Sequence, residues 1–473
     1  MQLPLLLPGF WLVDVRNKAC HPPSEKQPEK ACPRSASVPN PSRTRKVPSP
    51  LIIITFAVTL APPTCDARIW RVEADGGGDY QSIQEGIVAS QSGDTILVGI
   101  GLYSEHIDFI GKDLVVRSIL GPGLTTIDGS QFQGSVVTFS SQETRSAVLE
   151  GFTITGGTGS TDFGVTPRGG GIICVESSPT IRGNRIIGNS LSIAHSIGAG
   201  IAVGSGLIDV PVAEPLIEKN LFENNVTAGN GGGVSIQHSC AVICNNSFKH
   251  NSCEEDGGGI WGIFLEAGST IENNWFSDNL ATDHGGGMYL SRLGSGKIIS
   301  VQRNVLVRNV ASGISPADSS SGGGMWLYGL SGQIVHNTLV GNEGRDPSIC
   351  GGGGGMFIED VDTGLELALN IVALSIGCGI TSESATPRTG VNLFWGNQPF
   401  DSLENWDAQI VADPLFCSVA TDDYSLSYGS PGFVGGSFLG AIPESGCALV
   451  RVSAASWGHI KAMFLKTKPR GIR

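Results

Sequence analysis

The stretch NNSFKHNSCEEDGGGIWGIF, residues 245–264, contains the repeat that decides the fold. It holds Asn246 and Asn251 with an apolar residue between them, followed by three glycines and a second apolar residue. The asparagine pattern, Asn-x-apolar-x-x-Asn, recurs with first asparagines at Asn184, Asn220, Asn246, Asn274, Asn304, Asn337 and Asn392, and in a variant copy from Asn370 to Ser375. Glycine triplets lie between the copies and begin at Gly169, Gly231, Gly257, Gly285, Gly322 and Gly353.

This repeat predicts a solenoid built from strands. No copy contains a convincing amphipathic helix, which argues against leucine-rich, ankyrin and tetratricopeptide repeats. About three short strands in each copy would pair with their equivalents one coil later, roughly 4.8 Å away. Asparagines tolerate left-handed turns and can bond to their own copies, while glycines permit positive φ angles and close backbone approach. We therefore predict an all-β fold, a single right-handed parallel β-helix of about ten coils.

The ends of such a solenoid need covers, because open strand edges aggregate. Residues 79–92, DYQSIQEGIVASQS, place Ile83, Ile87 and Val88 at helical spacing and predict a short N-terminal capping helix, followed by a strand at Thr95–Val98. Residues 411–447, or the tail, would cover the far end.

Composition excludes several classes of protein. Hydrophobic residues make up 40% of the chain and charged residues 15%, which argues against disorder. The 67 glycines follow no Gly-X-Y period, so a collagen is excluded. The formal net charge is −13, and the body of the chain, residues 68–450, carries a net charge of −23, which should repel nucleic acid and anionic membranes.

The beginning of the chain is typical of an exported protein. Basic residues at Arg43, Arg45 and Lys46 precede an apolar run, Leu51–Leu60, that is too short to span a bilayer, and cleavage is expected after Ala67. Translation would then begin at a non-Met codon such as Val38 or Val47. A buried helix or membrane anchor at 51–60 is the alternative.

We divide the chain into a non-native or disordered leader (1–46), a signal peptide (47–67), an N-terminal cap (68–92), the β-helix (93–447) and a basic tail (448–473). The tail is either a sorting or docking helix or a frayed terminus. The mature protein is expected to be secreted or on the cell surface, monomeric and without a transmembrane span. Export permits disulfides, and Cys417 and Cys447 are the best pair. No Cys-x-x-Cys is present, so no metal site is predicted.

Further stretches resemble the pectin-lyase-like superfamily of right-handed parallel β-helix repeat proteins. The run GGGDYQSIQEGIVASQSGDTILVGIGLYSEHI (76–107) resembles the opening of its members, including pectin methylesterases. Five further stretches resemble bacterial secreted or surface members of undefined activity: GPGLTTIDGS (121–130), LEGFTITGG (149–157), GGGIICVESSPTIRGN (169–184), DPLFC (413–417) and SPGFVGGSFLGAIPESGC (430–447). The motif sets of polygalacturonases, pectate lyases and pectin methylesterases do not carry over. The resemblance therefore implies the fold and leaves the activity open.

Aromatic residues follow four consecutive glycine triplets at one register position: Trp261, Tyr289, Trp326 and Phe357. The residue before each should point inward, so the aromatic side chains should point outward in one row. Flat rings with polar edges suit sugar faces, so we expect this row to bind a glycan chain. Alternatively, the rings pack beneath the corner loops and stiffen the solenoid.

The corner loops beside this row are acidic. They contain Glu255 and Asp256, then Asp283 and His284, with Asp318, Arg345 and Asp346 in later copies. Neighbouring carboxylates could serve as acid and base in glycosidic cleavage, or as a base for elimination. Calcium binding and a solubilising loop edge are the alternatives; no other cofactor is expected.

The sequence thus predicts a protein that binds, and could process, extracellular polysaccharide or a surface glycan. As an enzyme it would be a polysaccharide lyase or a glycoside hydrolase, with carboxylates a few ångströms apart beside the rings. The alternative is a non-enzymatic surface adhesion or structural protein, whose carboxylates would be scattered and fully solvated.

Overall fold

The computed structural model describes residues 66–442, except 163, 205–211, 293–298, 314–321, 345–351, 362, 402–408 and 435–436. The predicted leader and basic tail, nearly all of the signal peptide, and the residues Cys447, Asp318, Arg345 and Asp346 lie outside the described residues. The chain divides into residues 1–66 and 67–473, and the structure described below belongs to the second part.

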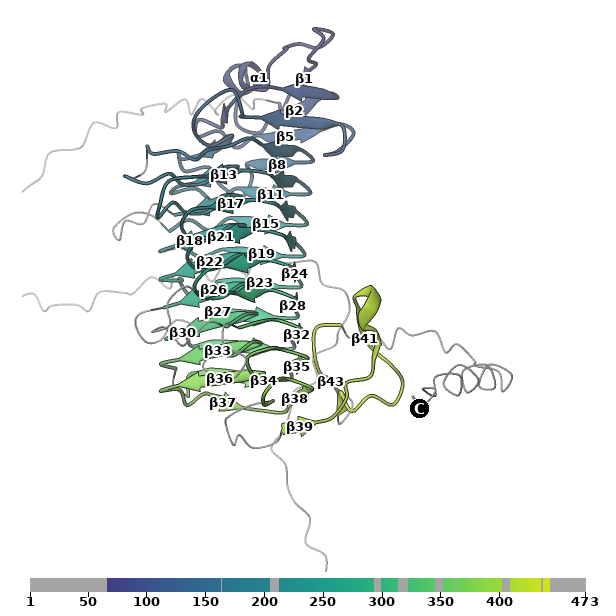
Figure 1. The fold of residues 1–473 in the computed structure, drawn as a ribbon. Coiled ribbons are helices and arrows are strands. Elements are labelled where there is room, and N and C mark those ends of the chain that lie inside the picture. Colours follow the sequence, from purple (N-terminus) through teal and green to yellow (C-terminus); the bar gives the residue numbers. More distant parts are fainter. Residues whose placement is uncertain are drawn as a thin grey trace, which may run out of the picture. The chain divides into compact units, whose positions relative to one another are not determined.

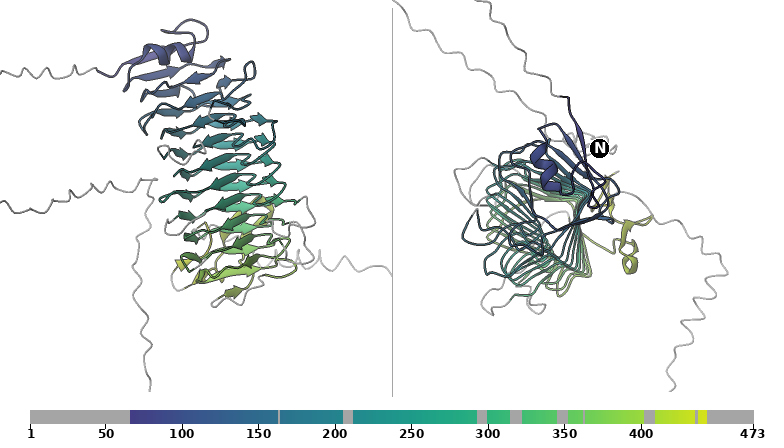
Figure 2. Two further views of the ribbon diagram at one scale, coloured as in Figure 1. Left: turned by 90° about the vertical axis from the view of Figure 1, so that its left-hand side faces the viewer. Right: turned by 90° about the horizontal axis from the view of Figure 1, so that it is seen from above.

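The described residues form a single right-handed parallel β-helix, as predicted (Figure 1). Each coil passes through three long parallel sheets, named sheets A, B and C in the order in which the chain meets them. Seen along the axis, equivalent strands lie above one another (Figure 2). A fourth parallel sheet of two-residue strands, sheet D, was not predicted and lies between sheets B and C in the middle coils.

Sheet A contains β1 (Ile69–Val72), β2 (Thr95–Val98), β5 (Val115–Ser118), β8 (Val148–Glu150), β11 (Thr180–Arg182), β15 (Leu216–Glu218), β19 (Val242–Cys244), β23 (Thr270–Glu272), β27 (Ile299–Gln302), β31 (Gly332–Val335), β34 (Leu365–Ala368) and β37 (Arg388–Thr389). Sheet B contains β3 (Gly101–Tyr103), β6 (Thr125–Asp128), β9 (Thr153–Thr155), β12 (Arg185–Ile187), β16 (Leu221–Glu223), β20 (Ser247–Lys249), β24 (Trp275–Ser277), β28 (Val305–Val307), β32 (Thr338–Val340), β35 (Ile371–Ala373), β38 (Asn392–Trp395) and β39 (Gln409–Val411).

Sheet C contains β4 (Ile107–Asp108), β7 (Val137–Phe139), β10 (Ile172–Cys174), β14 (Ile201–Val203), β18 (Val234–Gln237), β22 (Ile260–Ile263), β26 (Met288–Ser291), β30 (Met325–Tyr328), β33 (Met356–Glu359) and β36 (Ile380–Glu383). Sheet D contains β13 (Ser190–Leu191), β17 (Val226–Thr227), β21 (Ser252–Cys253), β25 (Leu280–Ala281) and β29 (Val310–Ala311).

The core consists of inward side chains stacked in files along the axis. On sheet B, the rings of Phe222, Phe248 and Phe276 lie fully buried with centroids 4.6 Å apart and planes within 3° of parallel. Successive coils are one strand spacing apart, so each inward side chain packs against the equivalent side chain of the next coil. The same residue type repeated at one position therefore packs without voids.

Buried asparagines form two ladders at the corners on either side of sheet B. In the first ladder, Asn246 donates to Oδ1 of Asn274 from its backbone nitrogen at 2.9 Å and from Nδ2 at 3.0 Å. The expectation that these asparagines take the left-handed conformation is wrong. The residue before most of them does so, for example Asn245 (φ 57°) and Asn273 (φ 55°). In the unbroken parts of the ladders, as at Asn246, the ladder uses both the backbone N–H and the side chain of the asparagine, so the neighbouring residue makes the bend.

The glycine triplets have the two roles that were predicted. Gly257 has a φ of +73°, and a Cβ on Gly258 would lie 2.5 Å from the carbonyl oxygen of Gly286 in the next coil. A side chain at these positions would therefore strain the backbone or push adjacent coils apart.

A short helix, α1 (Ile83–Ala89), covers the first coil. Ser82 caps it, accepting a hydrogen bond from the backbone nitrogen of Glu85 at 3.1 Å. Ile83 and Ile87 are fully buried as predicted, whereas Val88 is 60% exposed.

The C-terminal segment differs from the prediction, because it folds back along sheet B. It contains β40 (Phe416–Ser418), the 3-10 turn η1 (Val419–Thr421), β41 (Asp423–Leu426), β42 (Phe433–Val434) and β43 (Ser437–Phe438), with β40–β41 and β42–β43 antiparallel. In Figure 1, β41 and β43 lie beside the last coils. Tyr424 packs with the outward side chains of Val305 and Val340, because sheet B is apolar outside as well as inside in these coils.

Candidate functional site

The four predicted aromatic residues occupy one register row on sheet C. Trp261 pairs with Tyr289, Tyr289 with Trp326, and Trp326 with Phe357. The residue before each one, such as Met288 or Met325, is fully buried in the core. The rings therefore lie on the outward side of the sheet, in consecutive coils.

The rings do not present their flat faces to solvent. Trp261, Trp326 and Phe357 are 7%, 6% and 3% exposed, and Tyr289 is half-buried. Tyr289 and Trp326 lie face to face, with centroids 4.4 Å apart and planes 11° from parallel. Neighbouring coils are one strand spacing apart, so each ring covers the face of the next ring. Only the edges of the rings remain for contact with a ligand.

Trp326 is the centre of this aromatic cluster. The ring of Tyr328, two residues further along β30, lies 5.6 Å from it, and the imidazole of His284 lies 5.3 Å away. The indole Nε1 is buried and has no hydrogen-bond partner in the part of the chain that the structure describes. A buried donor without a partner is uncommon in folded proteins.

His284 contacts Asp256, the equivalent corner residue of the preceding coil. Oδ1 of Asp256 lies 2.8 Å from Nδ1 of His284 and accepts a hydrogen bond from its backbone nitrogen at 3.1 Å. The two side chains are 23% and 21% exposed, so solvent reaches both. A carboxylate on one ring nitrogen orients an imidazole beside the aromatic cluster, as acid–base chemistry requires.

Glu359, which was not predicted, lies on the same outward face of sheet C as Tyr328. It lies two residues after Phe357, in register with Tyr328 on one side and Glu383 on the other. Burial raises the pKa of Glu359, Glu383 raises it further, and His284 acts in the opposite direction. Strict alternation along β33 could have revealed it, since Glu359 is the next outward position after Phe357.

The other two predicted catalytic candidates are placed differently. The carboxylate of Glu255 bonds to Nδ2 of Asn230 and to Nδ1 of His195, toward the preceding coils. Asp283 lies in the same corner, and its backbone nitrogen donates to the carbonyl oxygen of Glu255 at 3.1 Å. The structure thus brings Asp256 and His284 together, and holds Glu255 in a separate network.

Three further observations concern the chemistry of the described residues. Among residues 66–442 with the gaps given above, no group of three or more His, Cys, Asp or Glu side chains is placed to hold a metal ion. No helix in the described part is long and apolar enough to cross a membrane. Cys417 is disulfide-bonded, and because Cys447 lies outside the described residues, their pairing stays a prediction.

A match to one protein-family model agrees with the fold. Residues 170–385 match a family model described as a right handed beta helix region. Among solved structures, the chain is similar to a pectin methylesterase from carrot at 12% identity, with a TM-score of 0.29. That alignment covers 88% of this chain and 98% of the carrot protein. No curated protein matches the chain.

Proposed function

Because the chain is a right-handed parallel β-helix repeat protein with rings and carboxyl groups on one outward face, we propose that it binds and processes an extracellular polysaccharide there. The observation that carries the proposal is the contact of the aromatic cluster with the Asp256–His284 pair. The extracellular location rests on the signal peptide expected at residues 47–67.

Binding would use the edges of the stacked rings. The half-buried Tyr289 and Tyr328 place hydroxyl groups beside apolar ring carbons. Sugar rings present C–H groups beside hydroxyls, so such edges can pack and hydrogen-bond at once. Sheet C continues along the axis on both sides of the cluster, which suits an extended chain.

Processing would use two groups with opposite tasks. Glu359, whose pKa burial raises, would give a proton to the glycosidic oxygen as the bond to that oxygen breaks. His284, oriented by Asp256, takes a proton either from the water that attacks the sugar carbon or from the C–H group beside a uronate. The first route is hydrolysis and the second is elimination, and both balance without a cofactor.

The experiment tests cleavage and binding together. The purified exported protein is incubated with neutral and acidic polysaccharides, and new reducing ends and the ultraviolet absorbance of unsaturated uronates are measured. Glu359→Gln should abolish cleavage and leave binding within about twofold, because an amide cannot give up a proton. Glu366→Gln on β34 of sheet A is the matched control and should behave as wild type. Absence of both binding and cleavage for every polysaccharide would contradict the proposal.

A second candidate function is a non-enzymatic surface protein. The burial of Trp261, Trp326 and Phe357 favours it, since buried rings stiffen a solenoid without any ligand. Polysaccharide binding without new chain ends in any reaction would support this function and exclude the enzymatic one.

A further inference from the structure

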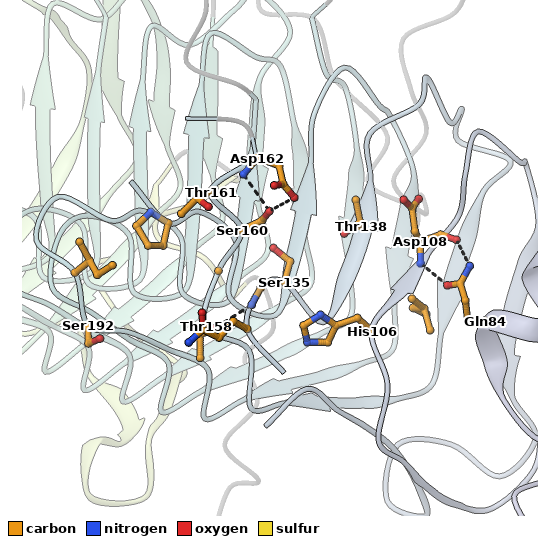
Figure 3. Close-up of a pocket in the computed structure, with 16 residues that line it drawn as sticks. Gln84, His106, Asp108, Ser135, Thr138, Thr158, Ser160, Thr161, Asp162 and Ser192 are labelled. Atoms are coloured by element: carbon orange, nitrogen blue, oxygen red, sulfur yellow. Dashed lines mark hydrogen bonds between the residues drawn. The ribbon is translucent and has the colours of Figure 1, made fainter. Parts of the chain in front are cut away.

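A cavity lies on sheet C near the opposite end of the solenoid from the aromatic cluster. Its volume is about 570 Å³, within the range of small-molecule sites. Its walls come from α1, from β4 and β7, and from residues 158–162, 167 and 192–193 (Figure 3). The cavity and the aromatic cluster share no residue.

The cavity is lined mainly by uncharged polar side chains. Six of the lining residues carry hydroxyl groups: Ser135, Thr138, Thr158, Ser160, Thr161 and Ser192. Amides come from Gln84 and Gln133, carboxyls from Asp108 and Asp162, and an apolar edge from Pro167 and Ile193. Hydroxyls and amides both donate and accept hydrogen bonds, which matches ligands whose own groups do both.

The charge of the lining excludes anions as ligands. The described residues that line the cavity include no lysine or arginine. Arg168, next to Pro167, directs its guanidinium away to Oε1 of Gln237 on β18, at 2.7 Å. Burial lowers the pKa of His106 and raises the pKa of Asp108, so both groups are biased toward their neutral forms. A phosphate or uronate would meet carboxyl groups with no compensating cation.

Hydrogen bonds hold the walls in place before any ligand binds. The side-chain amide of Gln84 bonds to the backbone of Asp108 twice, at 2.7 and 3.2 Å. Thr158 accepts from the backbone nitrogen of Gly134 at 3.0 Å, and Ser160 donates to Asp162 at 2.9 Å, as Figure 3 shows. Walls that are already ordered reduce the entropy lost on binding.

We propose that this cavity is a binding site for a neutral, polyhydroxylated ligand, namely one or two units of a neutral sugar. The hydroxyl-rich walls would bond to the ring hydroxyls, and Asp108 and Asp162 would accept from them. The apolar edge at Pro167 and Ile193 would pack against C–H groups. This proposal does not rest on the function proposed for the aromatic cluster.

Thr138 is the position that tests the cavity without disturbing the fold. It lies on the floor of the cavity in an outward register row that continues through Ile173, Ala202 and Ser235 to Trp261. Later strands of the same sheet therefore accept large rings at this position. Thr138→Tyr should fill the cavity, and Thr138→Val should remove one hydroxyl while keeping the branched shape.

The experiment measures binding of glucose, galactose, mannose and galacturonate to the full chain by ligand-observed NMR and calorimetry. Thr126→Val is the matched control, since Thr126 is a half-buried outward threonine on β6 of sheet B, outside the cavity. We expect saturable binding of at least one neutral sugar. Binding should become about threefold to tenfold weaker in Thr138→Val, be lost in Thr138→Tyr and be unchanged in Thr126→Val. Circular dichroism establishes that each variant is folded.

Three outcomes would overturn the proposal: no neutral sugar binds, folded Thr138→Tyr binds as wild type does, or galacturonate binds as tightly as the neutral sugars. Failure of the proposed function is separate, because it would appear as unchanged polymer binding in variants of Tyr289 and Tyr328. Those variants should leave sugar binding in the cavity intact.

Discussion

His284 and Asp256 lie one coil apart, and their Nδ1 and Oδ1 atoms are 2.8 Å from each other. Asp256 comes directly before the glycine triplet of its own coil, and His284 holds the same position in the next coil. The repeat itself therefore creates the pair, since stacking places equivalent corner residues within hydrogen-bond reach.

We expect Asp256→Asn to act through the orientation of His284. An amide can still occupy the position, but it pairs poorly with a charged imidazole. The variant should lower kcat by about tenfold to a hundredfold with little change in KM, and should shift the pH dependence of kcat. Steady-state kinetics on the best polysaccharide across pH provide the measurement. An unchanged pH profile would show that Asp256 only supports the corner.

Glu359 should make stability depend on pH. Its pKa is raised in the folded protein, chiefly by burial, so the folded state holds this proton more tightly than the unfolded state does. Stability is therefore lost as pH rises through the raised pKa, and Glu359→Gln should be more stable than wild type near pH 7. The difference should vanish at about pH 3, below the ordinary glutamate pKa, where the carboxyl is protonated in both states.

Urea unfolding of wild type and Glu359→Gln at both pH values measures this difference. Removing the second carboxyl with Glu383→Gln should reduce it, because Glu383 contributes to the raised pKa. A difference of the same size at both pH values would refute the assignment.

The second asparagine ladder contains one repairable gap. Asn309 donates to Oδ1 of Asn342 from N and Nδ2, both at 2.9 Å, but Ser375 occupies the next place and its buried Oγ has no partner among the described residues. Ser375→Asn should restore two bonds from Asn342 and raise stability by about 1–2 kcal/mol. Calorimetry should show a higher Tm, and a lower Tm would mean that the corner at Gly355 is too tight.

Arg308 attaches the C-terminal segment to the solenoid. It bonds to Asp278 at 2.8 and 3.1 Å and to Asp422 at 2.6 and 3.2 Å, and its hydrogen bonds to Asp422 hold the pKa of that carboxyl below its usual range. Asp422→Asn should release residues 416–441 to proteolysis at neutral pH. The effect should disappear as the pH falls through the lowered pKa of Asp422, where wild type loses the same pair.

The exposed position of these groups limits the loss of global stability to below about 1 kcal/mol. Arg388→Gln, which removes an exposed pair at 4.0 Å on sheet A, is the matched control and should leave the digestion pattern unchanged. Equal digestion of wild type and Asp422→Asn would contradict this role of Arg308.

The fold was predictable because residues repeated along the sequence show which positions pair between successive coils. Asn246 and Asn274 occupy the same position in successive repeats, which predicts their contact. Gly257 and Gly258 predict a corner where a side chain does not fit. The position of the C-terminal segment was not predictable, because the sequence does not show that Val305 and Val340 are outward residues of sheet B that another segment covers.

The site was predictable in part. Sequence spacing placed Trp326 and Tyr289 in one row but said nothing of ring orientation, which depends on contact between neighbouring coils. Glu359 was missed because it is the second outward residue of β33, beyond the aromatic row, and because its burial, which raises its pKa, depends on the folded surroundings.

Polysaccharide binding by the paired variant Tyr289→Ala with Tyr328→Ala tests the central claim most directly. These are the partly exposed rings of the cluster, whereas Tyr428, 89% exposed and remote in sequence, provides the control Tyr428→Ala. We predict that the paired variant loses at least about tenfold in affinity for the polysaccharide that wild type binds, while the control retains it. Unchanged affinity in a folded paired variant would contradict the assignment of the binding site to this face of sheet C.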